Sequence, residues 1–358
     1  PDIMLLDEPT NHLDTESMEW LESYLKDYPG TILVVSHDHF FLDKIATQIA
    51  ELANGRIHLY PGNYTHYLSE KERRLDALKK EMELQKAQIK KIEGFVERFR
   101  YKATKASQVQ SRVKMLEKFK DLQTEGPAKS VVMKFPEAKK SAKEVVTVCR
   151  LGHAYGDLTV FSDLNFSLFR GDKVAFVGVN GSGKSTLSRL LSLSEKPTRG
   201  SVKYGEGVTM AFFSQESSQN LNYENTIWEE VQSVPTSADD RNKRNLLGAF
   251  LFSGDDIFKS VGVLSGGEKS RLALLKIMLL DTNFLVLDEP TNHLDIKTKD
   301  VFQNALLHYS GTVAIVSHDR YFLDRLVNRV FELKDGAITD YAGNYSYFIE
   351  KRTPGAAE

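Results

Sequence analysis

An internal repeat constrains the fold of this 358-residue chain more than any other feature. Residues 7–14 read DEPTNHLD, and residues 288–295 read the same eight letters, 281 positions later. The same offset, without gaps, relates further segments such as SHD, FLD and GNY in the two copies. Residues 1–68 therefore repeat residues 282–349, which predicts two copies of one domain end.

The repeat also predicts how the chain divides into domains. Because the chain opens at Pro1 directly on an apolar strand, we expect it to lack the front of the first copy. That missing N-terminal part would be a structural partner of the residues present here. The predicted boundaries are 1–68 for the end of the first domain, 69–125 for a linker, 126–143 for a connecting segment, 144–350 for a complete second domain and 351–358 for a tail.

Short runs rich in Ile, Leu and Val indicate buried parallel strands, and helical patterning separates them. Alternation of strand and helix is typical of an α/β fold. A composition of 41% apolar and 27% charged residues is globular, so the length allows more than one domain. The predicted strands are 3–6, 31–35, 145–151, 172–177, 208–213, 284–287 and 312–316, with a possible edge strand at 131–135, and the predicted helices between paired strands are 16–26 and 298–308.

Composition excludes a membrane-spanning role and favours a reducing compartment. No run approaches the eighteen or so consecutive apolar residues that a membrane helix needs. The single cysteine, Cys149, cannot form an internal disulfide, and we expect it to be a buried strand residue. The N-terminus carries no secretion signal, so the expected location is cytoplasmic.

A phosphate-binding motif precedes the second copy. Residues 178–185, GVNGSGKS, fit GxxxxGK[ST], follow an apolar strand and precede a helix-like run at 186–193. Glycines let the backbone approach phosphates so that successive N–H groups face the anion. Lys184 supplies a point charge to the phosphates, and the Ser185 hydroxyl can bind Mg²⁺.

Two carboxylates follow a buried strand in each copy. Asp288 and Glu289 end the strand 284–287, at the edge where ligands of open α/β sheets bind. One carboxylate can hold Mg²⁺ through water, and the next can orient or deprotonate an attacking water. A single Asp-Glu pair could equally be a solvated strand end with a helix cap. Its duplication, each time followed by a histidine after the next strand, favours the catalytic interpretation.

Together these motifs resemble those of the ATP-binding-cassette ATPases. The phosphate loop looks like their Walker A motif, FFSQE like their Q-loop, LSGGE like their signature sequence, the Asp-Glu pair like Walker B, and NHLD like their D-loop. The positions concerned in the complete copy are Gly178, Asn180, Gly181, Ser182, Gly183, Lys184, Ser185, Thr186, Gln215, Leu264, Ser265, Gly266, Gly267, Glu268, Asp288, Asn292 and Asp295. In the first copy they are Asp7, Asn11 and Asp14.

The resemblance implies hydrolysis of ATP to ADP and phosphate, with Mg²⁺ as the metal. The implied catalytic residues are Glu289 with the switch histidine His318, and Glu8 with His37. The implied metal-site residues are Ser185, Gln215, Asp288 and Asp7. Tyr155 stands where the family places a ring that stacks on adenine, although ordinary strand packing is an alternative.

In this family each nucleotide lies between two domains, gripped by the phosphate loop of one and the signature of the other. Ser265 and two glycines at the start of a helix predicted at Glu268–Leu280 would present N–H donors to such a phosphate. Neither composite site is complete within these residues, because the first copy has neither a phosphate loop nor a signature here. We therefore expect this chain alone to hydrolyse ATP poorly.

The segment between the copies carries a heptad pattern. Apolar residues recur at alternating spacings of three and four from Leu75 to Phe99, with Gln85 as the one polar member. A shorter stripe at Val109, Val113 and Leu116 follows a polar bend. These patterns predict a two-helix hairpin whose first helix, of about 35 residues, is roughly 50 Å long.

The far end of this hairpin is strongly basic. From Arg98 to Lys120 the chain has eight Lys or Arg residues against one acid, Glu117. A solvated helix face would explain such a charge, but a basic hairpin between two ATPase domains resembles the linker of the ABC-F subfamily, which reaches into the ribosome near a tRNA. The implied RNA-binding residues are Arg98, Arg100, Lys102, Lys105, Arg112, Lys114 and Lys118.

The resemblance thus implies a cytoplasmic translation factor with the ribosome and tRNA as partners. Cations on a rigid arm suit recognition of RNA phosphates and shape. Two alternatives are a DNA-acting ATPase that uses the hairpin on duplex DNA, and the ATPase subunit of a membrane transporter, for which a basic hairpin would be unusual. We expect no membrane partner.

Overall fold

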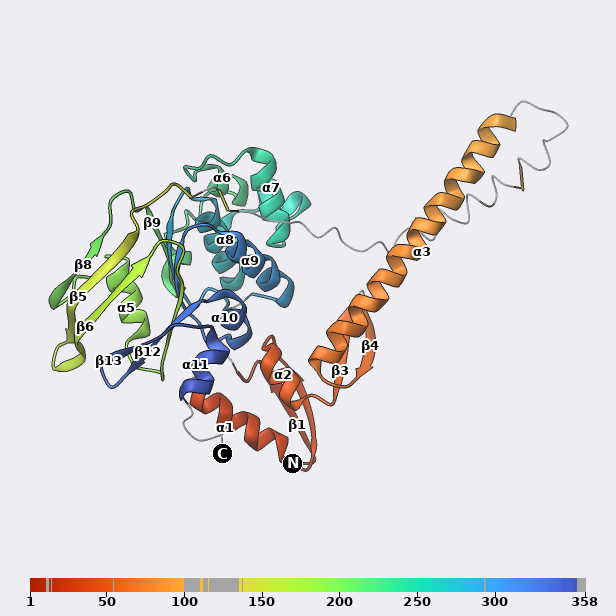
Figure 1. The fold of residues 1–358 in the computed structure, drawn as a ribbon. Coiled ribbons are helices and arrows are strands. Elements are labelled where there is room, and N and C mark those ends of the chain that lie inside the picture. The colour runs from red at the N-terminus through yellow and green to blue at the C-terminus, as the bar shows by residue number, and fades with distance from the viewer. Residues whose placement is uncertain are drawn as a thin grey trace. The chain divides into compact units, whose positions relative to one another are not determined.

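The computed structural model describes residues 1–10, 13, 15–53, 55–99, 110–111, 115, 135–136, 138–292 and 294–352 (Figure 1). The chain divides into two compact units. The first contains Pro1–Phe41 and Val131–Glu358, and the second contains Leu42–Ser130. The division falls inside the first copy of the repeat, directly after Phe41.

A six-stranded sheet forms the centre of the first unit. Its strand order is β13-β12-β7-β11-β10-β9, and all neighbours are parallel except β12 and β13. Every residue of β10 and β11 is buried, because helices or a second sheet cover both faces. The strands are β7 (Lys173–Val177), β9 (Met210–Phe213), β10 (Phe284–Asp288), β11 (Thr312–Val316), β12 (Arg329–Lys334) and β13 (Ala337–Tyr341).

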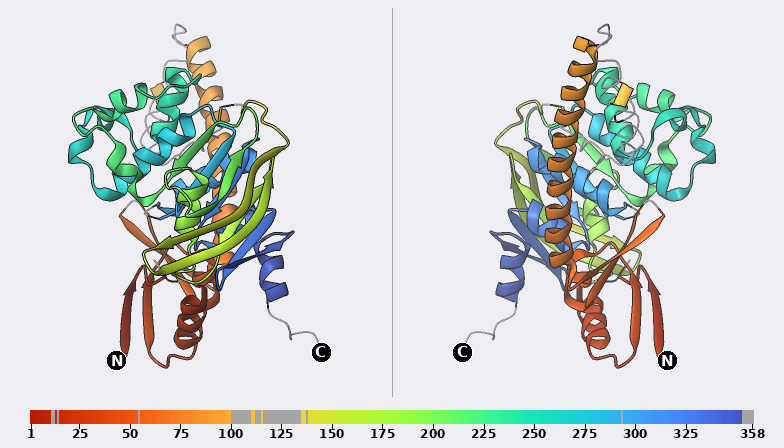
Figure 2. Two further views of the ribbon diagram at one scale, coloured as in Figure 1. Left: turned by 90° about the vertical axis from the view of Figure 1, so that its left-hand side faces the viewer. Right: turned by 90° about the vertical axis from the view of Figure 1, so that its right-hand side faces the viewer.

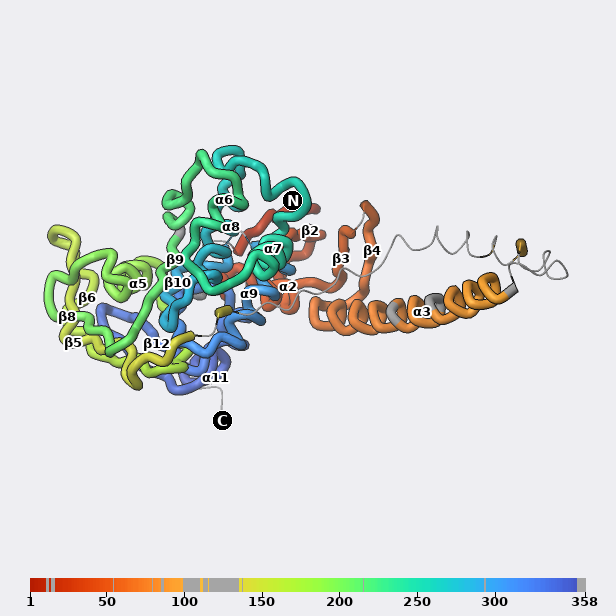
Figure 3. Tube along the Cα trace, turned by 90° about the horizontal axis from the view of Figure 1, so that it is seen from above, coloured from red at the N-terminus to blue at the C-terminus, as the bar shows by residue number. Residues whose placement is uncertain are grey.

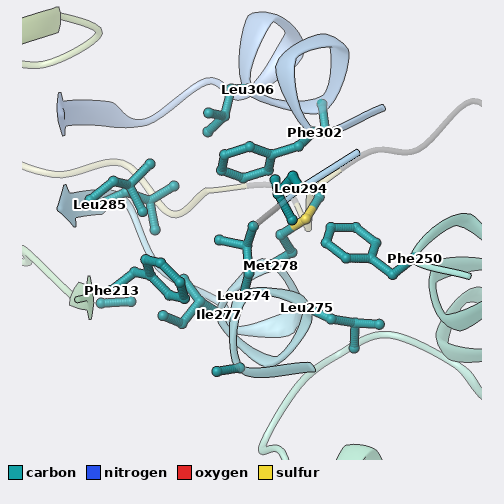
Figure 4. Close-up of a cluster of buried hydrophobic side chains, with 14 of the residues drawn as sticks. Phe213, Phe250, Leu274, Leu275, Ile277, Met278, Leu285, Leu294, Phe302 and Leu306 are labelled. Carbon is teal, nitrogen blue, oxygen red and sulfur yellow. The ribbon is translucent and has the colours of Figure 1, made fainter. Parts of the chain in front are cut away.

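Alternate residues of these strands enter two different cores. Leu285 and Leu287 pack with the helices on one face, and Figure 4 shows Leu285 in the same cluster as Leu274, Met278 and Phe302. Phe284 and Val286 point to the other face, where they join a second cluster. This period of two is the expected consequence of the pleat in a strand whose two faces are both covered.

A three-stranded antiparallel sheet of order β6-β5-β8 covers the second face (Figure 2). Its members are β5 (Glu144–Tyr155), β6 (Leu158–Phe169) and β8 (Arg199–Tyr204). The sequence predicted the start of β5 but ended it at residue 151, and it did not predict β6 or β8. The prediction that Cys149 is buried is wrong: it is exposed on β5, where it pairs with Ser201 of β8 at the start of a shift in register.

Helices complete this unit, and a group of short ones lies beyond one end of the sheet (Figures 1 and 2). The α-helices are α5 (Lys184–Leu191), α6 (Ile227–Gln232), α7 (Asp240–Ala249), α8 (Gly266–Leu279), α9 (Ile296–His308), α10 (Arg320–Leu326) and α11 (Tyr345–Arg352). The 3₁₀ segments between them, in the described residues, are η2 (Gln215–Asn220), η3 (Gly254–Phe258) and η4 (Val261–Val263).

The first copy contributes two parallel strands and a helix to the same unit. These are β1 (Ile3–Asp7), α1 (Thr15–Lys26) and β2 (Thr31–Val35). The register of β1 on β2, with Ile3 opposite Thr31, repeats that of β10 on β11, with Phe284 opposite Thr312. The predicted strand–helix–strand unit is therefore confirmed in both copies.

Equivalent strand positions differ in exposure between the copies. Leu5 is 72% exposed, whereas its counterpart Val286 is 1% exposed. Leu33 is 58% exposed, and its counterpart Ala314 is again 1% exposed. The first copy thus presents to solvent an apolar strand face that the second copy buries against further strands and helices.

The described part of the second unit contains a strand hairpin and one long helix. The antiparallel strands β3 (Gln48–Ala53) and β4 (Arg56–Pro61) precede α3 (Tyr64–Phe99), and α2 (His39–Ile45) runs across the boundary between the units. Tyr60, Tyr64 and Tyr67 form its small core. Figure 3 shows the first turns of α3 beside the β3–β4 hairpin and the rest of the helix extending away from it.

The predicted first linker helix is confirmed, with 36 residues in α3. Most of the predicted second helix, and the possible edge strand at 131–135 apart from Phe135, lie outside the described residues. None of the helices in the described parts of the chain is both long and apolar enough to cross a membrane.

Candidate functional site

The glycine-rich loop 178–183 joins β7 to α5, so it lies at the carboxyl edge of the central sheet. Gly183, the N-cap of α5, has φ +97°, a conformation that favours glycine. A Cβ atom at Gly183 would lie 2.5 Å from Cγ1 of Val160, and one at Gly178 would lie 2.4 Å from the carbonyl oxygen of Leu333. The loop can follow this path only because both positions lack a side chain.

Hydrogen-bond donors of the loop are positioned to bind an anion. The Lys184 ammonium donates to the carbonyl oxygens of Gly178 (2.8 Å) and Val179 (2.9 Å), so it already reaches back over the loop. The Ser182 hydroxyl is buried and has no hydrogen-bond partner among the described residues. Thr186 is buried in the first turn of α5. A phosphate would satisfy such donors, and the loop therefore fits the phosphates of a nucleotide.

Ser185 and Asp288 meet from different elements. The Ser185 hydroxyl donates to Oδ1 of Asp288 across 3.2 Å, which links the start of α5 to the end of β10. Burial raises the pKa of Asp288 above its usual value, and the hydrogen bond from Ser185 offsets only part of that rise. No group of three or more His, Cys, Asp or Glu side chains able to hold a metal occurs in the described part of the chain. One carboxylate and one hydroxyl nevertheless fit Mg²⁺, which usually keeps waters and takes substrate phosphates as its other ligands.

Glu289 has a strained backbone and a buried side chain. Its φ is +50°, which is unfavourable for any residue with a Cβ, and its N–H donates to the carbonyl of Val316 (2.8 Å). The side chain accepts a hydrogen bond from the His318 N–H (3.4 Å), and its Oε1 lies 3.5 Å from Nε2 of His318. Burial, reinforced by the charge of Asp288, raises the pKa of Glu289 to about 8. Such a carboxylate has the basicity to accept a proton from water near neutral pH.

The first copy repeats this arrangement. Glu8 has φ +45°, and its N–H donates to the carbonyl of Val35 (2.8 Å). Its side chain accepts a hydrogen bond from the His37 N–H (3.3 Å) and lies 3.4 Å from Nε2 of His37. Asp7, the counterpart of Asp288, ends β1. The strained glutamate and its histidine thus recur with nearly the same distances.

The LSGGE sequence forms the N-terminus of α8. Ser265 is the N-cap: its hydroxyl accepts from the Glu268 N–H (3.3 Å), while the Glu268 carboxylate accepts from the Ser265 N–H (2.8 Å). This capping box starts the helix at Gly266. The predicted start at Glu268 was therefore two residues late. The N–H groups of Gly266 and Gly267 belong to the first turn, where a helix has donors without intrahelical acceptors.

Tyr155 lies at the end of β5, and a polar network holds its ring. Its hydroxyl donates to Oε2 of Glu195 (2.9 Å) and accepts from Arg189 (3.0 Å). Arg189 also binds the same carboxylate, and Nε2 of His153 lies 3.1 Å from its other oxygen. The ring remains 43% exposed. A ring that is fixed and partly exposed can stack on a base. Ordinary strand packing would not explain why this much of the tyrosine is exposed. Sequence motifs gave no signal for Glu195 or Arg189.

Some predicted residues can be placed only in part. In the D-loop of the second copy, the Asn292 N–H donates to the carbonyl of Glu289, and Asp295 caps α9. The backbone of Gln215 begins η2, and Arg98 lies in the last turn of α3. Outside the described residues lie Asn11, Asp14, Arg100, Lys102, Lys105, Arg112, Lys114 and Lys118.

The phosphate loop, the Asp-Glu pair after β10 and the histidine after β11 lie together at one edge of a mainly parallel sheet. With the capped signature helix, they define a nucleotide-binding domain of the ATP-binding-cassette class. Residues 161–292 and 50–135 match two family models, both described as ABC transporter. The chain also resembles a bacterial Atm1-family ABC exporter solved with ATP bound, with a TM-score of 0.52 and 20% identity over 69% of this chain and 47% of that one. This likeness shows the fold.

Curated relatives define the family more narrowly. The chain is 43% identical to the putative ATP-binding protein YdiF of Bacillus subtilis over 99% of its length, and 39% identical to ABC transporter F family member 2 of Arabidopsis thaliana over all of it. It spans about half of these two proteins, 55% and 53% respectively. It is 40% identical over its full length to the energy-dependent translational throttle protein EttA of Haemophilus influenzae, of which it covers 65%. The chain belongs to the ABC-F family of ATP-binding-cassette proteins.

Proposed function

We propose that this chain is the ATP-hydrolysing part of a factor that binds the ribosome and modulates translation. The observation that carries the proposal is the duplicated pair of a strained glutamate and a histidine, Glu289 with His318 and Glu8 with His37. Two such pairs in one chain suit two nucleotide sites that act together. The reaction is the conversion of ATP and water to ADP and phosphate.

Different residues of the second copy would bind the phosphates, hold the metal and accept the proton. Bound ATP with Mg²⁺ would supply the γ-phosphate and a divalent charge. Lys184 and the N–H groups of the loop would hold the phosphates, and Ser185 with Asp288 would hold the metal, with Gln215 as a further ligand. Glu289 would accept a proton from the attacking water, a role worth roughly 10²- to 10⁴-fold in rate. His318 would hold Glu289 in position relative to the γ-phosphate.

Each site would need groups from both copies. The signature at Ser265–Gly267 would face a nucleotide held by the first copy, and the second-copy site would receive a signature from outside residues 1–358. The sequence holds only one GxxxxGK[ST] motif. We expect this chain alone to hydrolyse ATP at least tenfold more slowly than the full-length protein, because half of each composite site would be absent. Equal turnover numbers for the two polypeptides would rule out composite sites.

The linker supports the proposal that the protein uses ATP hydrolysis while it binds the ribosome. A helix of 36 residues is about 54 Å long at 1.5 Å per residue, and the segment that follows is basic. EttA, a relative across the whole chain, is named as an energy-dependent translational throttle protein. We infer that the tip of the linker contacts RNA phosphates of the ribosome or its tRNA, which would place the protein in the cytoplasm.

Charge reversal of the tip tests the choice of partner. Replacing Arg98, Arg100, Lys102 and Lys105 by Glu should lower ribosome affinity at least tenfold, because each lost phosphate contact weakens binding. ATP turnover without ribosomes should stay within twofold. Binding to duplex DNA is measured at the same salt concentration. Tight DNA binding that the reversal abolishes, with unchanged ribosome binding, would establish the DNA-acting alternative instead.

A further inference from the structure

One lysine touches the histidine loops of both copies. Lys299 lies in the first turns of α9, and its ammonium donates to Oδ2 of Asp319 across 2.7 Å. The same ammonium donates to the backbone carbonyl of His37 in the first copy across 3.2 Å. Its side chain is 14% exposed, so these hydrogen bonds form largely away from water. Charge-assisted hydrogen bonds of this kind are roughly twice as strong as neutral ones.

Both partners of Lys299 belong to the catalytic loops. Asp319 directly follows His318 and caps α10, with Oδ1 accepting from the Phe322 N–H (3.0 Å). His37 supplies the carbonyl on one side, while its N–H binds the Glu8 side chain on the other. The carbonyl and the N–H of His37 belong to adjacent peptide units, so a shift of the Lys299 ammonium would reach the N–H that holds Glu8 through the backbone of His37.

Further contacts between the two copies surround Lys299. Arg320 forms a buried ion pair with Glu22 of α1 at 3.3 Å. The rings of His39 and Tyr321 lie 4.6 Å apart. Burial lowers the pKa of His39 to about 4, so this ring is neutral and adds no cation beside Lys299. The lysine is thus held at a packed contact rather than on a free surface.

The two copies differ at this position. The repeat aligns Lys299 with Met18, which is 1% exposed and carries no charge. Met18 can pack but cannot donate to a carbonyl. The lysine contact with the opposite histidine loop therefore has no equivalent on α1, which reaches the second copy through the ion pair of Glu22 with Arg320 instead.

We propose that Lys299 is a positioning residue that ties α9 of the second copy to the Glu8–His37 pair of the first. The inference rests on the proposed ATPase function. It assigns the first-copy site a dependence on a lysine of the second copy, and the first copy has methionine at the equivalent position. Removal of the ammonium should slow hydrolysis at the Glu8 site, because the peptide between His37 and Asp38 loses its donor, and should leave substrate affinity there unchanged.

The test uses full-length protein in which one site is silenced. With Glu289→Gln the remaining turnover comes from the Glu8 site, and with Glu8→Gln it comes from the Glu289 site. Lys299→Met, which copies the side chain of Met18, should lower kcat at the Glu8 site about tenfold or more at constant KM. Its effect on kcat at the Glu289 site should be smaller, because Asp319 loses the Lys299 ammonium but keeps its bond to the Phe322 N–H. Lys299→Arg should restore most of the loss.

Lys297→Met is the matched control, since Lys297 is an exposed lysine of the same helix. Equal losses at both sites, or none at either, would refute the inference. If Lys299→Met fails to fold, Lys299→Gln takes its place, with the same expected split between the sites. Absence of hydrolysis by the unmutated protein would count against the proposed function itself, so the two failures are distinguishable.

Discussion

Glu289 shows how one residue joins backbone geometry, burial and chemistry. A left-handed backbone turns its side chain toward the His318 N–H, and the buried position raises its pKa to about 8. The group is therefore mostly protonated below pH 8 and mostly ionised above it. A protonated carboxyl cannot accept a proton from water, so activity should require the higher pH.

The first prediction concerns this pH dependence. In full-length protein with the Glu8 site silenced by Glu8→Gln, kcat should rise up to tenfold per pH unit below about pH 8 and level off above it. Glu289→Gln should lower kcat at least a hundredfold, with ATP binding retained. Turnover measured from about pH 6 to 9 checks both. A kcat that is flat across that range would show that Glu289 is not the base.

The second prediction concerns Glu195, which orients Tyr155. Glu195→Ala removes the acceptor of the tyrosine hydroxyl, so the ring should become mobile. We expect the Kd for ATP to rise about threefold to tenfold, the scale of one ordinary hydrogen bond. Isothermal titration of the second-copy site measures it. Glu206→Ala, a change at an exposed acid, is the control. Unchanged ATP affinity in Glu195→Ala would mean that the network does not serve nucleotide binding.

At the residue scale, motifs predicted Lys184 and Glu289 because their chemistry is tied to fixed local spacing. The sequence did not predict Glu195 or Lys299. Glu195 acts through Tyr155, 40 positions away, and Lys299 acts through His37, 262 positions away. Local patterns carry no information about such pairs, which only the folded chain brings together.

At the scale of elements, the capping box of α8 fixes where the signature helix begins. Both Ser265 and Glu268 use their side chains to satisfy donors of the first turn. The helix therefore includes the two glycines, which have low intrinsic helix propensity. The sequence predicted the helix but placed its start at Glu268, two residues after the observed one.

The third prediction tests that cap. Ser265→Ala should destabilise the protein by about 1 kcal/mol, the typical cost of losing an N-cap side chain. Ser265→Thr keeps the hydroxyl and should cost less than half as much. Urea unfolding of the two variants gives the difference. Equal stability of Ser265→Ala and the parent would mean that the box contributes nothing to α8.

The fourth prediction concerns the attachment of α3. Glu51 of β3 accepts from Lys71 (2.6 Å), Tyr67 (3.0 Å) and Tyr60 (3.2 Å), and thus ties the first turns of α3 to the hairpin. Glu51→Ala should speed amide hydrogen exchange in residues 64–75 about tenfold, because the removed acceptor leaves a partly buried lysine without its counterion. Glu70→Ala, which breaks only an exposed ion pair with Arg73, should have no effect. Equal exchange in both variants would show that packing alone holds the helix.

Among the elements, the sequence predicted buried strands and the long helix best. Continuous apolar runs marked β10 and β11, and a heptad pattern marked α3. The strands β6 and β8 were missed because each is buried on one side at most and carries polar residues throughout. Secondary structure of that kind depends on its neighbours more than on its own pattern.

At the scale of the whole molecule, the chain is marked by its internal repeat and by the uneven distribution of charge along its sequence. The formal charge of −2 combines a linker, residues 70–125, with six more basic than acidic residues, and a remainder that is acidic. Such a distribution would direct the linker toward polyanions and leave the ATPase parts less attracted to them. The repeat predicted the shared fold of the two copies, but it did not predict that Lys299 contacts the histidine loops of both.

Nucleotide can change the hold on a partner only if the two states of the protein differ in affinity for that partner. The proposed account requires that ATP, gripped between the two copies, brings them together into a form that stays on the ribosome until hydrolysis.

The most direct measurement is ribosome sedimentation with the full-length protein carrying both Glu8→Gln and Glu289→Gln. With ATP, the ribosome-bound fraction should rise at least tenfold over that with ADP and should not decline with time, because the closed form cannot hydrolyse its nucleotide. The protein without these substitutions should dissociate as ATP is consumed. A bound fraction that is the same with ATP, ADP and no nucleotide would contradict the account.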